Sequence, residues 1–459
     1  MMRMDVRRME SWVSRLLDAD DRFSGIGLKD YARAIPRIDA LNLSKGAPVL
    51  VRCDVDVKIV EGRVRDDARL RSAMETLNHC IGRGWKTVIF GHIGRDPELS
   101  LGPVAERFSE LLGKDVKFVE DWTDGEAVKA GVYRAVSRAG AGDVLLLENT
   151  RRHDIERALW YPEKRTKETV ERFLSMARGF RRMGKAFVNE AIASSGRDMS
   201  SCIVPAAMDR VALGFFYHRE LEQHLVGASD ADMVIFSGLK MDKLDDLLGV
   251  VRRGKVKSVI TAGALAMALK KAHARMEGKD FCIGKAETEE GEEYYISPER
   301  VEQAMNILSL GRSKGVRFVV PQDFVLDDGS VSESIPAGKA QLDIGPRTRE
   351  AVREELNRFL RGSGNGPGRP VVFHNGVFGK FEEPAFGEGT RWFMEQLRLL
   401  KEGGARVYVG GGEGAEALRK YGDESWVNHA FSCGGTVLTA MAGEPIPPLK
   451  ALAMRCGQS

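Results

Sequence analysis

Residues 86–119 read KTVIFGHIGRDPELSLGPVAERFSELLGKDVKFV, and this stretch carries the pattern that predicts the fold. Two short apolar, β-branched runs at 86–90 and 116–119 enclose a longer segment with helical periodicity. The same alternation continues through most of the chain, and it is typical of parallel sheets flanked by helices, the α/β class. The other runs that predict strands are 48–55, 143–147 and 185–188 in the first half, and 233–236, 257–260, 316–320, 369–373, 406–409 and 429–431 in the second half.

A helical segment between the halves divides the chain into two predicted domains. Residues 215–226 contain the apolar set Phe216, Leu221 and Leu225, which predicts a connecting helix and a boundary near Gly214. We expect two Rossmann-like domains, each a parallel sheet flanked by helices, joined by a hinge helix. The predicted parts are an N-terminal extension at 1–38, a first domain at 39–213, the hinge helix at 214–228, a second domain at 229–440, and a C-terminal segment at 441–459 that packs back toward the hinge.

The start of the chain has the pattern of an amphipathic helix that packs on the main body. The apolar residues at helical spacing are Val6, Met9, Trp12, Val13, Leu16 and Leu17. The segment lacks the apolar core of a signal peptide, and its acidic residues disfavour an organellar transit peptide. Near the other end, the composition of Arg361–Arg369, RGSGNGPGR, predicts a surface loop.

Composition excludes several classes of protein. The 459 residues carry 69 Lys plus Arg against 66 Asp plus Glu, a net charge of +3, which argues against a dedicated nucleic-acid binder. No apolar run approaches the roughly 18 residues that span a bilayer, so we expect no membrane partner. The six cysteines form no C-x-x-C pair, and so few thiols in so long a chain favour a reducing cytoplasm.

Charged residues follow the predicted strands of the first half. Ligands of open parallel sheets bind beyond the carboxyl ends of the strands, where several arginines suit a phosphorylated, anionic small molecule. The residues at these ends are Arg52, Asp54, Asp56, Arg69, His92, Arg95, Asn149, Arg151 and Arg197. The alternative for any one arginine is a loose surface ion pair, and His92 taken alone is equally consistent with a hydrogen-bonded structural histidine.

Glycine follows the predicted strands of the second half. The strand ends read FSGLK, TAGALA, HNGVFG, VGGGEG and SCGG, and Lys240, Lys243 and Glu413 lie beside them. Small residues let a ligand approach the backbone, and N–H groups at a helix start bind phosphate, so a nucleotide is the expected ligand. A basic anion site and a glycine-rich phosphate site together predict phosphoryl transfer. The chain has no P-loop, no protein-kinase H-R-D and no G-x-G-x-x-G in a first βαβ unit, which excludes two kinase classes and disfavours a dinucleotide dehydrogenase.

In combination, these residues resemble the phosphoglycerate kinase family. The resemblance runs from about Gly46 to Leu452 and includes GDVLLLENTR, SKGVRFVVPQDFVL, LDIGP and NGVFGKFE. It implies a two-domain hinge-bending enzyme of glycolysis and gluconeogenesis, acting as a cytoplasmic monomer. That enzyme transfers a phosphoryl group between ATP and the carboxylate of 3-phosphoglycerate, a small-molecule substrate, with Mg²⁺.

The resemblance also implies roles for single residues. It makes Arg69 and Lys240 catalytic, and it places Glu413 at the metal. The residues that it assigns to the acid substrate are Arg52, Asp54, Asp56, His92, Arg95, Arg151 and Arg197. Those that it assigns to the nucleotide are Lys243, Gly263, Asn375, Glu382, Gly410, Gly411, Gly412 and Glu413.

Several positions depart from the family pattern. Asp56 replaces an asparagine, Gly196 and Met199 replace the histidines beside Arg197, and GGGEG replaces G-G-G-D-[ST]. Val377 replaces a proline, and Lys243 lies three residues after Lys240 where the family has four. Two alternatives therefore stay open: a paralogue that acts on another carboxylate, and a non-catalytic homologue that binds nucleotide. The N-terminal extension of about 35 residues lies outside the resemblance.

Overall fold

The computed structural model describes residues 4–292, 294–362 and 369–457. They form two compact units: a first unit of the chain up to Gln223 together with the residues from Pro445 onward, and a second unit, His224–Glu444. The central part of the predicted loop Arg361–Arg369, residues 363–368, lies outside the described residues.

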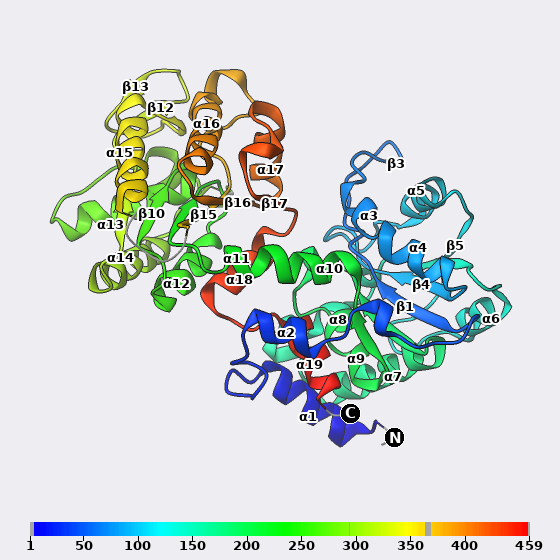
Figure 1. The fold of residues 1–459 in the computed structure, drawn as a ribbon. Helices are drawn as coiled ribbons and strands as arrows, with labels where there is room; N and C mark the ends of the chain where they lie inside the picture. The colour runs from blue at the N-terminus through cyan, green and yellow to red at the C-terminus, as the bar shows by residue number, and fades with distance from the viewer. Residues whose placement is uncertain (1–3, 293, 363–368, 458–459) are drawn as a thin grey trace. The chain divides into compact units, whose positions relative to one another are not determined.

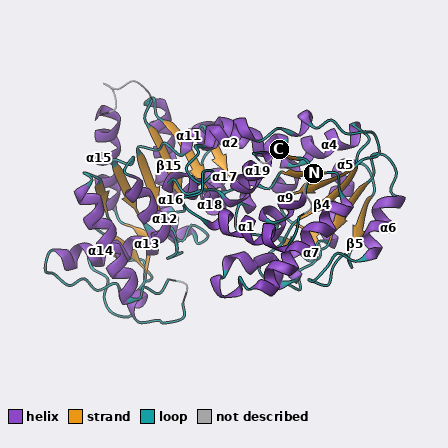
Figure 2. Cartoon of the chain, turned by 90° about the horizontal axis from the view of Figure 1, so that it is seen from below, coloured by secondary structure: helices purple, strands orange, loops and turns teal. Residues whose placement is uncertain are grey.

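The first unit is built on a six-stranded sheet in which all neighbouring strands run parallel. In spatial order the strands are β5 (Val116–Val119), β6 (Val144–Leu147), β4 (Lys86–Phe90), β1 (Pro48–Arg52), β7 (Ala186–Asn189) and β8 (Val211–Leu213). Its helices are α1 (Val6–Leu17), α2 (Leu28–Ala34), α3 (Ala68–Ser72), α4 (Met74–Gly82), α5 (Gly102–Leu112), α6 (Ala130–Arg138), α7 (Lys167–Met183), α8 (Met199–Cys202), α9 (Val204–Ala207), α10 (Phe215–Arg219) and α19 (Pro447–Cys456). Helices cover both faces (Figure 2), which explains why the strands are almost continuously apolar.

The second unit has a parallel sheet with the strand order of a dinucleotide-binding fold. In spatial order its strands are β11 (Arg317–Val319), β10 (Ser258–Thr261), β9 (Met233–Phe236), β15 (Val371–Asn375), β16 (Arg406–Gly410) and β17 (His429–Phe431). Its helices are α11 (Val226–Ala228), α12 (Lys243–Arg253), α13 (Gly263–Met276), α14 (Pro298–Ser313), α15 (Pro346–Gly362), α16 (Glu388–Glu402), α17 (Gly412–Tyr421) and α18 (Gly434–Ala442). A small antiparallel sheet of β12 (Phe324–Leu326), β13 (Val331–Ser332) and β14 (Gln341–Ile344) completes the unit.

In each large sheet there is one pair of neighbouring strands from which the chain continues in diverging directions, toward opposite edges of the sheet. In the first unit this switch point lies between β1 and β7, and in the second unit it lies between β9 and β15. Ligands of open α/β sheets bind beyond the carboxyl ends of the strands at such a point. The topology of each unit alone therefore indicates where a ligand binds.

All eleven predicted strands are present, with ends that shift by up to three residues. The α/β class and the two parallel sheets are likewise as predicted. The sequence patterns did not predict β8, the small sheet, or the hairpin of β2 (Ile59–Val60) and β3 (Arg63–Val64). These strands have only two to four residues, too few for a period of two to stand out.

The predicted connecting helix is continuous from Phe215 to Ala228 (Figure 1) and changes type along its length. It begins as α10, continues as a π-helical segment over Glu220–Leu225, and ends as α11. Leu221 and Leu225 are fully buried, as their spacing predicted. The two units divide inside the π-helical segment, between Gln223 and His224.

The N-terminal extension forms the predicted amphipathic helix, and it packs on the first unit. Asp5 caps α1 by accepting a hydrogen bond from the backbone N–H of Arg8 (3.0 Å). The Trp12 ring is buried, and its Nε1–H donates to the carbonyl oxygen of Cys202 in α8 (2.9 Å). Helices α1 and α2 also contact the C-terminal helix α19 (Figure 1), where Nζ of the buried Lys450 donates to the carbonyl oxygen of Asp18 (2.6 Å).

Replacement of Trp12 by phenylalanine is expected to lower the free energy of unfolding by about 1–2 kcal/mol. The change removes the hydrogen bond to Cys202 and leaves a small void in a packed interior. Urea unfolding measures the loss. Ser11→Ala, on the exposed face of the same helix, is the matched control and is expected to shift stability little. Equal losses in both variants would show that the extension does not pack through Trp12.

None of the helices in the described part of the chain combines the length and the apolarity that crossing a membrane requires.

Candidate functional site

The loops after β1 and β7 meet at the switch point of the first unit. The hydroxyl of Ser194, after β7, donates to Oδ1 of Asp54, after β1 (3.1 Å). Asp56 Oδ1 accepts from the backbone N–H of Gly94, which follows β4 (2.8 Å). Three strand ends are therefore tied together by the carboxylates that the sequence placed there.

Arg69 reaches these two carboxylates from α3. Its Nη1 donates to the carbonyl oxygen of Asp56 (2.6 Å) and lies 3.5 Å from Asp56 Oδ2 and 3.8 Å from Asp54 Oδ1. The side chain remains 32% exposed. The guanidinium is thus oriented by the protein yet open to solvent, as an arginine that meets a ligand must be.

Arg52 is fully buried at the end of β1 and is saturated with partners. Its Nη1 donates to the carbonyl oxygen of Cys53 (2.6 Å), its Nε donates to the hydroxyl of Ser200 (3.0 Å), and its Nη2 lies 2.9 Å from Nδ1 of His92. A buried guanidinium needs this degree of satisfaction because desolvation of the charge is costly.

Asp198 lies among the predicted basic residues, and sequence reasoning missed it. Its Oδ2 is 3.1 Å from Nδ1 of His92, 3.6 Å from Nη2 of Arg151 and 3.7 Å from Nη2 of Arg52. Burial by itself would raise the pKa of Asp198, but His92 and the two arginines hold that pKa below its usual range. The one available signal was its place directly after Arg197, in a loop that ends a strand.

His92 shares this buried cluster. Burial lowers its pKa, the charges of Arg52 and Arg151 lower it further, and the contact with Asp198 opposes the change. The imidazole is therefore a hydrogen-bonded member of the cluster, and its contact with a ligand stays a prediction.

Arg95, Arg151 and Arg197 line the outer part of the same loops. Nη1 of Arg151 donates to the carbonyl oxygen of Gly94 (2.8 Å), and the side chain is mostly buried. Arg95 directly follows Gly94 and Arg197 directly precedes Asp198, and both are exposed. The structure thus connects five of the seven predicted acid-site residues and Arg69 through a short series of contacts, whereas the exposed Arg95 and Arg197 adjoin this series only through their neighbours in the chain.

A second buried acid, Glu156, lies behind Asp198. It accepts from the backbone N–H of Ser200 (3.1 Å), from the Ser200 hydroxyl (2.5 Å) and from the hydroxyl of Thr150 (3.0 Å). Burial raises its pKa to about 7, and the charge of Asp198 adds to that rise while Arg52 opposes it. His92, Glu156 and Asp198 lie close enough to share a metal ion, but the guanidinium of Arg52 already supplies the positive charge there.

Glycines close the switch point of the second unit. Gly238, Gly263 and Gly376 have φ values of +108°, +68° and +99°, which favour glycine. A Cβ on Gly263 would lie 2.8 Å from the backbone nitrogen and oxygen of Gly238, and a Cβ on Gly376 would lie 2.1 Å from the carbonyl oxygen of Ser237. The strand ends therefore pack backbone against backbone, at distances that leave no room for a side chain.

Lys243 and Glu413 converge beside Gly238. Nζ of Lys243 donates to the carbonyl oxygen of Ser237 (2.6 Å), and a Cβ on Gly238 would lie 2.9 Å from that Nζ and 3.3 Å from Oε2 of Glu413. Burial lowers the pKa of Lys243, whereas the Glu413 charge raises it. Lys240 is exposed on the preceding turn. The shortened spacing thus leaves one lysine inside the switch point and the other facing solvent.

The remaining predicted nucleotide residues divide into two groups. Nδ2 of Asn375 donates to the carbonyl oxygen of Gly410 (3.1 Å), and so links β15 to the glycine run. Gly411 and Gly412 open α17, with Glu413 in its first turn, so the N-terminal end of a helix faces this region. Glu382 is exposed after β15, and no contact in the described structure joins it to the glycines.

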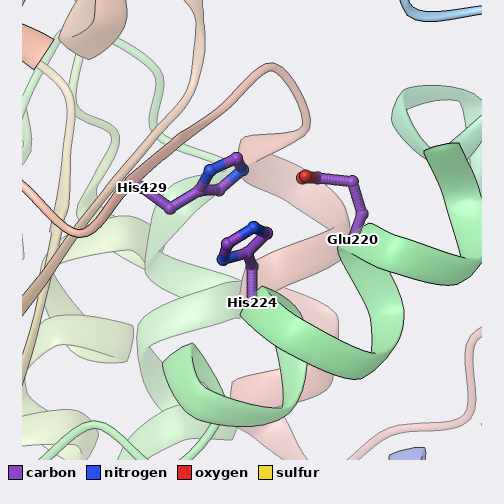
Figure 3. Close-up of side chains that lie close together, drawn as sticks. All are labelled: Glu220, His224 and His429. Carbon is purple, nitrogen blue, oxygen red and sulfur yellow. The ribbon is translucent and has the colours of Figure 1, made fainter.

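Two histidines of the second unit stack on each other. The rings of His224 and His429 have centroids 3.8 Å apart and planes only 3° from parallel (Figure 3). Glu220 lies one turn before His224 on the same helical segment. Lone pairs of stacked imidazoles lie in parallel planes and do not point at a common ion. We interpret the pair as a packing contact between this segment and β17.

His374 is fully buried in β15, beside the rings of Phe378 and Phe393. Burial lowers its pKa to about 3, and the charge of Lys243 adds to the effect. Because the unfolded chain binds a proton near pH 6.5, acid stabilises the unfolded state over the window between these two values. The contribution of the neutral, buried His374 to the free energy of unfolding is complete above pH 6.5 and is lost as the pH falls toward 3.

Replacement of His374 by phenylalanine is therefore expected to remove part of the acid sensitivity. Between pH 7.5 and pH 5 the native histidine costs about 2 kcal/mol of unfolding free energy, and the variant lacks this loss. Urea unfolding at the two pH values measures the difference. His273→Gln, at a partly exposed position on α13, is expected to keep the full pH dependence. An unchanged pH dependence in the phenylalanine variant would contradict the buried, neutral state of His374.

Comparison with known proteins shows the family of the chain. A family model described as phosphoglycerate kinase matches residues 38–444. Phosphoglycerate kinase of Clostridium botulinum (strain Alaska E43 / Type E3) is 30% identical over 425 residues, which cover 89% of this chain and 96% of that protein. Phosphoglycerate kinase of Fervidobacterium nodosum (strain ATCC 35602 / DSM 5306 / Rt17-B1) is 29% identical over 426 residues, with the same coverage.

Solved structures show the same fold. Phosphoglycerate kinase from Coxiella burnetii superposes with a TM-score of 0.67 at 24% identity, and phosphoglycerate kinase from Pyrococcus horikoshii OT3 superposes with 0.71 at 25%. Each match covers 92% of this chain and 100% of the other chain. With a family model that spans most of the sequence, and with the two sites at the switch points of their sheets, this chain belongs to the phosphoglycerate kinase family.

Proposed function

We propose that the chain transfers a phosphoryl group between ATP or ADP and the carboxylate of 3-phosphoglycerate, the step that glycolysis and gluconeogenesis share. The observation that carries the proposal is that each unit has its own candidate ligand site at the switch point of its sheet. The first unit presents basic residues there, and the second unit presents glycine backbone beside Lys243. Similarity to named phosphoglycerate kinases supports the choice of substrates.

In this mechanism the first unit binds and orients the acid. Arg95, Arg151 and Arg197 hold its phosphate, since arginine pairs with phosphate through two parallel hydrogen bonds. Asp54 and Asp56 accept from its hydroxyl group, and Arg69 faces the carboxylate that is phosphorylated. No general base is needed, because a carboxylate is already ionised at neutral pH.

The second unit binds the nucleotide. Backbone N–H groups at the start of α17 and the ammonium groups of Lys240 and Lys243 face the phosphates, and Glu382 lies near the ribose. The exposed carboxylate of Glu413 offers the oxygen ligand that Mg²⁺ prefers, with the remaining positions left for phosphate and water. When bound, the metal neutralises phosphate charge. Bending about the helix at 214–228 brings the substrates together and excludes water from the acyl phosphate.

ATP formation from ADP and 1,3-bisphosphoglycerate tests the proposal. The assay compares purified protein with Mg²⁺ and with an excess of chelator, and we expect turnover only with the metal. If folded protein that binds nucleotide shows no turnover, the proposed reaction is wrong. If turnover persists in chelator, the reaction stands and the role given to Glu413 and Mg²⁺ is wrong.

A further inference from the structure

The basic cluster of the acid site already contains an anion of its own. Asp198 is 1% exposed, and its Oδ2 lies within 3.7 Å of His92, Arg151 and Arg52. This position would suit an oxygen atom of a bound phosphate or sulfate, because three nitrogen atoms converge on it and two of them belong to guanidinium groups. The protein fills it with a carboxylate that cannot diffuse away.

A tryptophan fixes that carboxylate in place. The Nε1–H of Trp160 donates to Oδ1 of Asp198 (3.0 Å), so both carboxylate oxygens have partners. The indole lies directly on Gly196, where a Cβ would come within 2.2 Å of Cζ2. Glycine at 196, one of the positions where the family motif has histidine, is therefore what lets Trp160 reach Asp198. Trp160, Gly196 and Asp198 therefore hold one another in position.

The network behind Asp198 anchors it further. Ser200 lies two residues after Asp198, in α8. Its hydroxyl accepts a hydrogen bond from Nε of Arg52 and donates one to Glu156. Arg52 is fully buried, and a buried guanidinium without a counter-charge is strongly destabilising. Asp198 supplies that counter-charge whether or not a substrate is present.

We propose that Asp198 is a specificity-determining residue that excludes small inorganic anions such as phosphate and sulfate from the acid site. It occupies the innermost anion position, so only a ligand that reaches the outer, exposed Arg95 and Arg197 gains affinity. A phosphorylated acid with a second anionic end can span these residues and Arg69, whereas a free tetrahedral anion cannot. The inference rests on the proposed function for the identity of the acid, but not for the exclusion itself.

The test uses Asp198→Asn, with inorganic sulfate as the probe and no nucleotide present. The asparagine can still accept from Trp160 but lacks the charge, so Arg151 loses its counter-anion and a sulfate ion can pair with it from the outer side, beside the exposed Arg95 and Arg197. We expect a lower melting temperature without sulfate, recovery of that temperature with sulfate, and sulfate binding at least about tenfold tighter than in the native protein. The native protein is expected to show neither effect at the same ionic strength.

Two control variants separate charge from local disorder. Trp160→Phe removes a hydrogen bond from the same carboxylate but keeps its charge. We expect sulfate to change its melting temperature no more than that of the native protein, and its sulfate affinity to stay unchanged. Asp121→Asn removes a surface charge paired with Lys129, away from the cluster, and we expect the same. If either control gains sulfate affinity, or if Asp198→Asn gains none, the proposal is wrong.

The remaining outcomes also decide the matter. If Asp198→Asn folds only with sulfate, that dependence is the expected anion requirement. If it stays unfolded at every sulfate concentration while Trp160→Phe folds, Asp198 is a structural residue and the proposal fails. The readouts do not involve turnover, so a native protein without kinase activity would overturn the proposed function and leave this result readable.

Discussion

Replacement of Arg69 by alanine is expected to lower the rate of phosphoryl transfer by about 10³-fold or more, the range observed when a charge-stabilising arginine is lost. Arg69 is the partly exposed guanidinium that Asp54 and Asp56 orient at the switch point of the first unit. Its charge would stabilise the transferring phosphoryl group. Nucleotide affinity is expected to change little, because the proposed nucleotide site is built from residues of the second unit. Steady-state kinetics and a separate nucleotide titration measure the two effects.

The matched control is Arg71→Ala on the same short helix. Nε of Arg71 donates to Oδ1 of Asp67 (2.8 Å), and the side chain is 58% exposed, so it shares the helix and the charge but not the switch point. We expect it to keep nearly full activity. Full activity in Arg69→Ala, or an equal loss in both variants, would remove Arg69 from the proposed mechanism. Arg69→Lys is expected to recover only part of the rate, because lysine lacks the planar fork.

The parallel sheets were predictable because their strands are buried on both faces. A run such as Leu145–Leu147 is apolar at every position, and helices of nine or more residues separate such runs. Strand order was not predictable from these patterns, since nothing within a buried strand identifies its neighbours. The switch points, which place both sites, became visible only when the sheets were assembled.

Residues at strand ends were predictable for a related reason. The carboxyl ends of parallel strands share one edge, so Asp54, His92 and Arg151 were expected at the same edge of the sheet, and their proximity follows from β1, β4 and β6 being neighbours. Asp198 was not predictable, because a carboxylate beside an arginine in sequence is most often a solvent-exposed pair. Its burial depends on Trp160 and Gly196, whose contact with each other is tertiary. The different positions of Lys240 and Lys243 likewise depend on how one turn packs.

Replacement of Gly376 by alanine is expected to destabilise the second unit by about 3 kcal/mol or more and to abolish nucleotide binding. The added Cβ would lie 2.1 Å from the carbonyl oxygen and 2.6 Å from the carbonyl carbon of Ser237, and both are backbone atoms that cannot rotate away. The φ value of +99° is also unfavourable for alanine. Urea unfolding and a nucleotide titration measure the two losses.

The nucleotide loss follows from the place of this contact. The backbone N–H of Ser237 donates to the carbonyl oxygen of Asn375 (2.9 Å), so residues 237 and 376 close the gap between β9 and β15. Moving them apart displaces Gly238, and with it the region where Lys243 and Glu413 converge. Gly362→Ala in α15 is the matched control, because a Cβ there meets no atom within 4 Å and alanine favours a helix. Stability equal to that of the control would show that the strand ends are not closely packed, and intact nucleotide binding in a destabilised variant would place the ligand away from the switch point.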